Sequence, residues 1–275
     1  MLSVRYVFAD ISSEQAVLQN MIHICILVGV IAFGAFLLLS MALARWAVKP
    51  VEKAWQQQRQ FVADASHELK TPLTVIMTNA ELLSDPDSLP QQQGQLAQNI
   101  LTMSRQMRRL VEGLLELARV DNGAVQKAFE PVALSTLVED AILPFEPVYF
   151  ERGLSVKTRI QEGLTVQGSG EHLKQVVEIL LDNAMKYSDE GAVWVTLQRQ
   201  GNAILLKVAN PGEAMDEESC RKIFERFYRL DAARSMDGSY GLGLSIAKSI
   251  VEDHRGKIWA ESKNGWNIFT VQLPA

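Results

Sequence analysis

The chain has 275 residues, of which 48% are hydrophobic and 21% charged, so it is long enough for several units with real cores. Its formal net charge is −5 and it has no basic stripe that could neutralise the phosphates of a duplex, which argues against nucleic-acid binding. The two cysteines, Cys25 and Cys220, are too far apart in sequence to suggest a disulfide framework or a metal-ligand cluster.

The first recognisable element is an apolar segment, residues 21–44, that contains no Asp, Glu, Lys or Arg. As a helix rising ~1.5 Å per residue it would cross a hydrocarbon core of roughly 30 Å. Arg45 and Lys49 follow it closely, with Trp46 at the expected interface. Because basic residues accumulate on the cytoplasmic side of a span, we predict a single-pass membrane protein in the lipid bilayer. Residues 1–20 would form a short extracytoplasmic segment, and the C-terminal domains would be cytoplasmic.

A helical hairpin is predicted next, over residues 61–120. Two narrow apolar stripes at spacings of three and four are separated by the breaker-rich turn SDPDSLP, residues 84–90. Two such narrow stripes cannot bury each other well within one chain, so we predict a homodimer in which two hairpins form a four-helix bundle. An ordinary coiled-coil spacer is the alternative. The stripes comprise Val62, Ala65, Leu69, Pro72, Ile76, Ala80 and Leu83, and then Leu96, Ile100, Met103, Met107, Leu110, Leu114 and Leu117.

His67 falls outside the first stripe, about 200° around the helix from Ala65, so it is predicted to face solvent or a partner domain. An imidazole is largely unprotonated at neutral pH and is a fair nucleophile, and the adjacent Glu68 could orient the ring. The surrounding FVADASHELKTPLT, residues 61–74, resembles the phosphoacceptor box of bacterial two-component sensor histidine kinases. The resemblance implies that His67 accepts the γ-phosphoryl group of ATP. It also implies that Thr71, one turn away, positions water in a phosphatase reaction.

Residues 131–275 change character, because short β-like runs alternate with helical stretches and predict a mixed α/β domain. The amphipathic helix expected over residues 171–188 places Asn183, Lys186 and Tyr187 beside its buried stripe. This stretch resembles the asparagine box of the GHKL (Bergerat) ATPase fold that histidine kinases share with gyrase, Hsp90 and MutL. The resemblance implies that Asn183 ligates Mg²⁺, Lys186 approaches the phosphates and Tyr187 borders the nucleotide. The family usually has a polar residue where this chain has Ile179, which predicts a lower metal affinity or turnover.

Three further stretches resemble boxes of the same fold. VANPGEAM, residues 208–215, is similar to the adenine loop, with Asn210 in place of the usual aspartate and Gly212 for close backbone approach. Because an amide oxygen accepts the same hydrogen bond without a charge, we expect adenine recognition with some loss of affinity. KIFERFYRL, residues 222–230, resembles the phenylalanine box, with Phe224 and Arg229.

The last box is GSYGLGLSIAK, residues 238–248, a glycine-rich loop that opens directly into an apolar helix. Backbone N–H groups at the start of such a helix can bind phosphate oxygens, aided by the helix dipole. DAARSMD, residues 231–237, would be a mobile lid, and Arg229 and Arg234 could reach the terminal phosphate. The phosphate-binding residues of this loop are expected to be Gly238, Gly241, Leu242, Gly243 and Leu244.

These features together predict a membrane-anchored, multidomain sensor histidine kinase that uses ATP and Mg²⁺, phosphorylates His67 and passes the phosphoryl group to an aspartate of a response regulator receiver domain. It would also act as a phosphatase of that regulator. Two alternatives remain: a degenerate kinase that acts as a dimeric scaffold or phosphatase with weak nucleotide binding, and a membrane-tethered ATPase of the same fold. The predicted organisation is 1–20 extracytoplasmic, 21–44 transmembrane helix, 45–60 juxtamembrane linker helix, 61–120 phosphoacceptor hairpin, 121–130 linker and 131–275 ATP-binding α/β sandwich.

Overall fold

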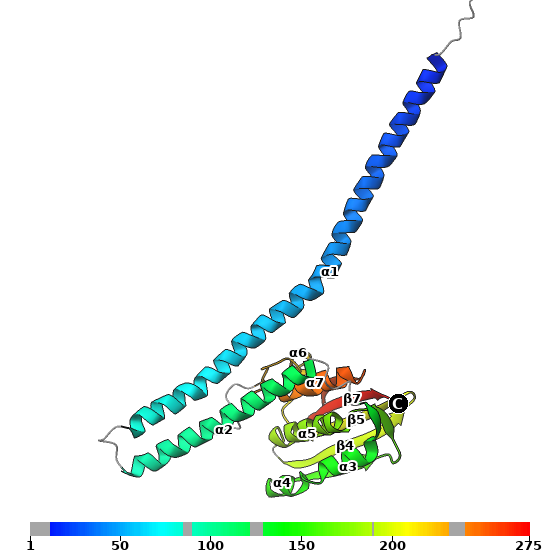
Figure 1. Ribbon diagram of the computed structural model, residues 1–275. Coiled ribbons are helices and arrows are strands. Elements are labelled where there is room, and N and C mark those ends of the chain that lie inside the picture. Colours follow the sequence, from blue (N-terminus) through cyan, green and yellow to red (C-terminus); the bar gives the residue numbers. More distant parts are fainter. Residues whose placement is uncertain (1–11, 85–89, 122–128, 189, 231–239) are drawn as a thin grey trace, which may run out of the picture. The chain divides into compact units, whose positions relative to one another are not determined.

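The computed structural model describes residues 12–84, 90–121, 129–188, 190–230 and 240–275 (Figure 1). The chain divides into two compact units, Met1–Ala63 and Asp64–Ala275, which are described separately below. Several predicted features lie outside the described residues. They are most of the turn at 84–90, most of the linker at 121–130, the lid at 231–237 with Arg234, and Gly238.

The first unit consists of the N-terminal part of one long helix, α1 (Ser12–Leu83). Its stretch Val17–Lys49 has a mean hydropathy of 2.7, and its apolar side chains are not buried by protein. This helix is therefore long and apolar enough to cross a membrane, as the composition of residues 21–44 predicts. The helix continues without a break through residues 45–60.

The second unit begins with the end of α1 and with α2 (Pro90–Asp121), which form the predicted hairpin. Most residues of the two predicted stripes are shielded, and Pro72, Leu110 and Leu117 are buried. Val62, which was predicted to begin the first stripe, is exposed instead. The Asn99 side chain donates a hydrogen bond to Oδ1 of Asn79, which joins the two helices at 3.2 Å. Large apolar side chains remain exposed on other faces of the pair: Leu73, Met77, Leu82, Leu101, Val111 and Leu115.

The rest of the second unit is a two-layer α/β sandwich, as predicted. Its main sheet has the strand order β2-β4-β5-β7-β6, with β2 and β4 parallel and the other neighbours antiparallel. The strands alternate buried and exposed side chains, so one face carries the core. The strands are β2 (Leu154–Ile160), β4 (Gly191–Gln200), β5 (Ala203–Pro211), β6 (Lys257–Lys263) and β7 (Trp266–Pro274).

The helical layer is built around α5 (Gly170–Lys186) and α7 (Gly243–Asp253), which contact each other and the sheet. Helix α3 (Leu134–Ile142) packs on α5, α4 (Glu146–Glu151) on β2, and α6 (Glu217–Lys222) on β6. A small second sheet pairs β1 (Glu130–Ala133) with β3 (Thr165–Gly168), and the sequence did not predict β1.

A buried histidine links the two helices that carry the candidate site. Nδ1 of His254, just after α7, contacts the carbonyl oxygen of Ile250 at 2.7 Å, and Nε2 accepts the backbone N–H of Ser169 at 2.9 Å. Because a carbonyl only accepts and an N–H only donates, the ring must be neutral with its proton on Nδ1. Burial lowers the pKa of His254, and the neighbouring His172 lowers it further. The start of α5 and the end of α7 are thus joined by one neutral ring.

Candidate nucleotide-binding site

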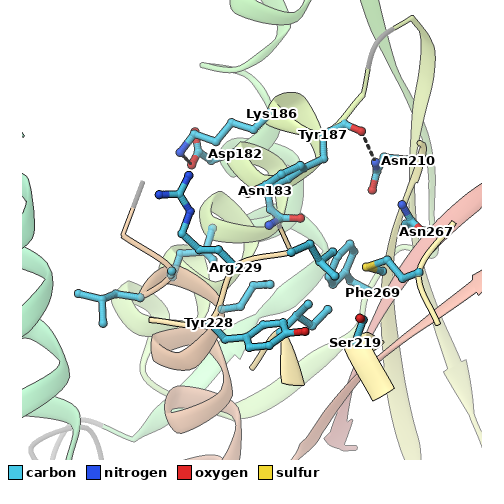
Figure 2. Close-up of a pocket in the computed structure, with 18 of the residues that line it drawn as sticks. Asp182, Asn183, Lys186, Tyr187, Asn210, Ser219, Tyr228, Arg229, Asn267 and Phe269 are labelled. Carbon is cyan, nitrogen blue, oxygen red and sulfur yellow. Dashed lines mark hydrogen bonds and ion pairs between the residues drawn. The ribbon is translucent and has the colours of Figure 1, made fainter. Parts of the chain in front are cut away.

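A cavity of about 620 Å³ lies between α5, the segment after β5, the start of α7 and β7 (Figure 2). This volume is in the usual range for a site that holds a small molecule. Most residues that the sequence predicted for nucleotide binding line this one cavity, although they come from separate segments. They are Asn183, Lys186, Tyr187, Asn210, Arg229, Gly241, Leu242, Gly243 and Leu244.

Helix α5 contributes the polar side chains of its last turn. Asn183 points into the cavity, while the Lys186 ammonium donates to a carboxylate oxygen of Asp182 one turn earlier (Figure 2). Asp182 also lines the cavity and was missed by the sequence analysis. Ile179 lines it as well, so the position that is usually polar in the family presents an apolar surface here.

The end of β5 places a fully buried Asn210 next to the end of α5, and Gly212 follows directly after the strand. The Asn210 amide donates to the carbonyl oxygens of Tyr187 and Pro211, at 3.3 and 3.1 Å. Gly212 does not line the cavity, but a Cβ added there would lie only 2.7 Å from the carbonyl oxygen of Tyr187. Glycine at this position therefore allows the segment after β5 to lie close to the end of α5, while the approach to a nucleotide expected of Gly212 stays a prediction.

The glycine loop leads into α7, whose N-terminal residues border the cavity. Gly241 has a φ of +68°, and a Cβ there would lie 2.7 Å from the carbonyl oxygen of Tyr228. Glycine is required on both counts. Four successive residues, Gly241 to Leu244, face the cavity at a helix start, which suits the binding of phosphate oxygens.

The phenylalanine box borders the cavity through other residues than predicted, since Ile223, Tyr228 and Leu230 line it as well as Arg229. Phe224 is buried and does not line the cavity, so its role in the structure is packing. Arg229 does line it, and its side chain points toward Asp182 (Figure 2). Its Nε is buried and has no hydrogen-bond partner among the described residues.

The three predicted phosphoacceptor residues lie on α1. His67 and Thr71 are exposed and Glu68 is half-buried, and the Thr71 hydroxyl donates weakly to the backbone carbonyl of His67 at 3.5 Å. None of the three lines the cavity, but Arg109 and Gly113 of α2 do. Burial raises the pKa of Tyr240 in the glycine loop, and the negative charge of Glu68 raises it further.

Sequence reasoning missed several cavity residues on β7 and on the segments around α6. The polar one on β7 is Asn267, which pairs with Asn210 across the sheet and is buried. It falls on the same strand face as Phe269, Val271 and Leu273. An amide side chain on an otherwise apolar strand face was the one feature of the sequence that could have indicated a site residue here. The other missed residues include Asp182, Met215, Ser219, Tyr228 and Phe269.

An α/β sandwich with an asparagine on α5 and a glycine loop at the start of the adjacent helix α7 defines a nucleotide-binding ATPase domain. Sequence-family comparison agrees: residues 168–275 match the family described as "Histidine kinase-, DNA gyrase B-, and HSP90-like ATPase". Residues 57–123 match the "His Kinase A (phospho-acceptor) domain". The two regions together make up more than half of the chain, so the chain belongs to the two-component sensor histidine kinases.

Individual relatives point the same way. The "Sensor protein DltS" of Streptococcus agalactiae is 35% identical over 245 residues, which are 88% of this chain and 61% of that protein. The chain therefore spans less than two thirds of that relative's length. The structure of the Acinetobacter baumannii histidine kinase AdeS covers 76% of this chain, with a TM-score of 0.62 and 24% identity over 97% of its own length. The histidine kinase ThkA, solved in complex with the response regulator TrrA, covers 78% of this chain and 61% of its own length, with a TM-score of 0.56 and 23% identity. Both structures share the fold.

Proposed function

We propose that this chain is a membrane-bound sensor histidine kinase that transfers the γ-phosphoryl group of ATP to His67. The observation that carries the proposal is the cavity at the start of α7, which gathers Asn183, Lys186 and the glycine loop. The exposed imidazole of His67 lies in the second unit, in the region that matches the phosphoacceptor family. A tethered ATPase of the same fold would leave His67 without a role. The proposed boundaries remain 61–120 for the phosphoacceptor hairpin and 131–275 for the ATP-binding domain.

Mg²⁺ is the metal that we propose for this site. Mg²⁺ usually keeps several waters and takes few protein ligands besides the phosphates. The amide oxygen of Asn183 is a suitable single ligand at the cavity wall, and the described residues contain no cluster of three or more His, Cys, Asp or Glu that would suit a transition metal. The ion, when bound, would neutralise phosphate charge.

The chain's own residues would contribute positioning and charge. The N–H groups from Gly241 to Leu244 would hold phosphate oxygens, and Lys186 and Arg229 would supply positive charge beside them. A ring nitrogen of His67 would attack the γ-phosphorus while the bond to the ADP oxygen breaks. Glu68 would hold the other ring N–H and stabilise the charge that the ring gains. Phosphohistidine and ADP are the products.

The phosphoryl group would then pass to an aspartate of a response regulator receiver domain. The support for this partner is family membership together with the ThkA relative, which was solved with its regulator. Phosphatase activity toward the same regulator is part of the proposal, with Thr71 orienting the attacking water one turn from His67. The exposed Thr71 hydroxyl is available for that role.

The hairpin would act as a homodimer. Exposed large apolar side chains on α1 and α2, such as Leu73, Met77 and Leu115, remain uncovered in a single chain, and a second copy would bury them symmetrically. In the membrane, α1 would cross the bilayer once between about residues 21 and 44. The basic residues that follow would keep the kinase part in the cytoplasm.

The decisive experiment is incubation of the full chain, in detergent micelles, with γ-labelled ATP and Mg²⁺. We expect acid-labile, alkali-stable label on the wild type and none on His67→Gln, with the same ATP affinity in both. The neighbouring exposed Ser66→Ala is the control and should be labelled normally. If the wild type bound ATP but carried no label, the degenerate-kinase scaffold would be the better hypothesis. Ile179 and Asn210 favour that hypothesis, because both depart from the family pattern.

A further inference from the structure

We propose that the ATP-binding domain docks on the anionic cytoplasmic surface of the lipid bilayer through the face of its main sheet that its helices leave uncovered. This outer face consists of the side chains of β2, β4, β5, β7 and β6 that point away from α5 and α7. The inference goes beyond the proposed function. It depends on insertion of α1 in the membrane and is independent of phosphoryl transfer to His67.

Strand register and burial define the outer face. Val193, Val195 and Leu197 of β4 are buried on the side of the helical layer, so the residues between them point to the other side of the sheet. Directly paired residues of neighbouring strands point to the same side. The register therefore carries this assignment from β4 across all five strands.

The outer face carries an excess of positive charge, although the whole chain has 27 Lys and Arg against 32 Asp and Glu. The only acidic side chain that points outward from these five described strands is Glu261, and it is paired with Lys263 at 3.2 Å. The acidic residues Glu217 and Glu218 of α6, which contacts β6, are paired within their own helix. The outward cations are Lys157, Arg159, Lys207, Lys257 and Lys263.

The outer face also holds every tryptophan of residues 131–275: Trp194 on β4, Trp259 on β6 and Trp266 on β7. Trp194 is 40% exposed, and the ammonium group of Lys157 lies 5.3 Å from the centroid of its ring. Tryptophan together with Lys and Arg is the composition of protein surfaces that lie at a membrane–water interface. The outer face has this composition without belonging to a membrane span.

The charges are spread over a width that suits a surface better than a small ligand. Lys157 and Arg159 lie on the edge strand β2, Lys257 and Lys263 on the opposite edge strand β6, and Lys207 on β5 between them. Neighbouring strands are ~4.8 Å apart, so the two edges are separated by about 19 Å. A layer of anionic headgroups reaches both edges at once, whereas a single small anion does not.

The chain's own membrane span supplies this layer. The hydrogen bond between Asn99 and Asn79 sets the register of α2 against α1, and from Asn99 the helix runs about 33 Å back along α1 to Asp121. Only residues 122–128 separate Asp121 from Phe129, where the ATP-binding domain begins. The domain is therefore joined to the end of the hairpin at which the chain arrives from the span.

This tether favours the bilayer over a separate acidic partner. Cytoplasmic leaflets contain anionic lipids, and each Lys or Arg near their surface strengthens binding about fivefold. A domain on the same chain as the span has a high effective concentration at the leaflet, so a weak attraction per charge is sufficient. A free acidic protein or a nucleic acid has no such advantage.

The test measures how close the outer face comes to lipid in the full chain. Gln200, exposed at the end of β4, is replaced by cysteine in a chain with Cys25→Ala and Cys220→Ala, and is labelled with a donor fluorophore. This parent chain is placed in nanodiscs of phosphatidylcholine, alone or mixed with phosphatidylglycerol, that contain acceptor-labelled lipid. We expect about twofold or more energy transfer in the anionic discs relative to the neutral ones. High salt should abolish the difference, because it screens exposed charges.

Two triple variants of the parent chain remove the same amount of charge from different surfaces. Neutralising outward cations should weaken docking about 100-fold and bring energy transfer in anionic discs to the level of neutral discs. This variant carries Lys157→Gln, Arg159→Gln and Lys257→Gln. The matched control neutralises exposed cations on α5, α6 and α7 and should behave like the parent chain. It carries Lys174→Gln, Arg221→Gln and Lys248→Gln.

A third variant guards against a folding defect, because Lys157→Arg, Lys207→Arg and Lys257→Arg keep the charge and should dock like the parent chain. Equal energy transfer in neutral and anionic discs would overturn the inference. So would an equal loss in both glutamine variants, or a difference that survives high salt. Failure of the proposed function is a separate result, because docking is measured without nucleotide and label on His67 is measured independently on the same discs.

Discussion

The phosphoacceptor hairpin and the ATP-binding domain differ in how much of their apolar surface is buried within a single chain. The α/β domain is closed, because both layers contribute to one core that contains fully buried residues such as Leu180, Val195 and Ile250. The hairpin is open, because Leu73, Met77 and Leu115 remain exposed in one chain. The α/β domain buries its apolar residues through its own contacts, whereas the hairpin leaves large apolar side chains exposed in a single chain. We propose that a second copy of the hairpin covers them.

This difference also separates two kinds of functional residue. His67 lies on an exposed helix face, so its proposed reaction requires another domain to bring the nucleotide to it. The positions of Asn183, Asn210 and Gly241 are set by neighbouring residues of the same domain. Substituting them should therefore alter the geometry of the cavity. Four predictions test this contrast, beginning with the largest expected effect.

Asn183→Ala should reduce His67 labelling by about 100-fold or more, because it removes the oxygen proposed to hold Mg²⁺ beside the phosphates. The hairpin should be untouched, so the variant should dimerise like wild type. Quantitative labelling with γ-labelled ATP, together with sedimentation of the same samples, measures both. The exposed Glu171 at the other end of α5 supplies the control, Glu171→Gln. Normal labelling of Asn183→Ala would remove this residue from the site.

Leu115→Asp should weaken dimerisation by roughly 100-fold, because two-fold symmetry loses one buried leucine from each chain and introduces two carboxylates. Nucleotide affinity should not change, since Leu115 lies outside the cavity. Dilution of fluorescently labelled chains in micelles reports the dimer dissociation constant. Thr102→Asp, also exposed on α2, controls for added charge. If both variants dimerised equally well, the exposed apolar face of α2 would not be the interface.

Gly212→Ala should destabilise the ATP-binding domain by about 1–3 kcal/mol, because the new Cβ would lie 2.7 Å from the Tyr187 carbonyl. It should also weaken ATP binding by pushing the end of α5 away from β5. Gly170→Ala is a matched control, since its Cβ would meet Val132 at an ordinary 3.9 Å. Thermal melting and ATP titration compare the two. Equal melting temperatures would show that the segment after β5 adapts easily.

The smallest effect concerns His254, whose pKa is lowered by burial and then by His172. Below the ordinary value near 6.5 the unfolded chain takes up a proton that the folded chain resists, so stability is full above that value and falls as pH decreases through the window below it. His254→Gln removes this term, and the melting temperature of wild type should therefore fall by a few degrees more than that of the variant between pH 7.5 and 5.5. Identical shifts would mean that folding does not lower the pKa of His254.

Much of this molecule could be predicted from local pattern. Periodicities of three to four and of two placed the hairpin stripes and six strands, because burial of one face acts residue by residue along the chain. The charge-free run at 21–44 predicted a span by composition, and the glycines at 241 and 243 predicted a loop that enters a helix. His67 could be placed on the outer face of α1 from spacing alone.

The sequence could not supply the pairings between distant segments. Only the sheet register sets Asn267 opposite Asn210, and only tertiary contacts turn their amide nitrogens toward three backbone carbonyls. Phe224 is the opposite case. Its sequence context resembled part of the nucleotide site, but in the structure its side chain packs in the core. Periodicity determines which face of a segment is buried, whereas the hydrogen-bond partner of a buried polar group depends on which segments meet.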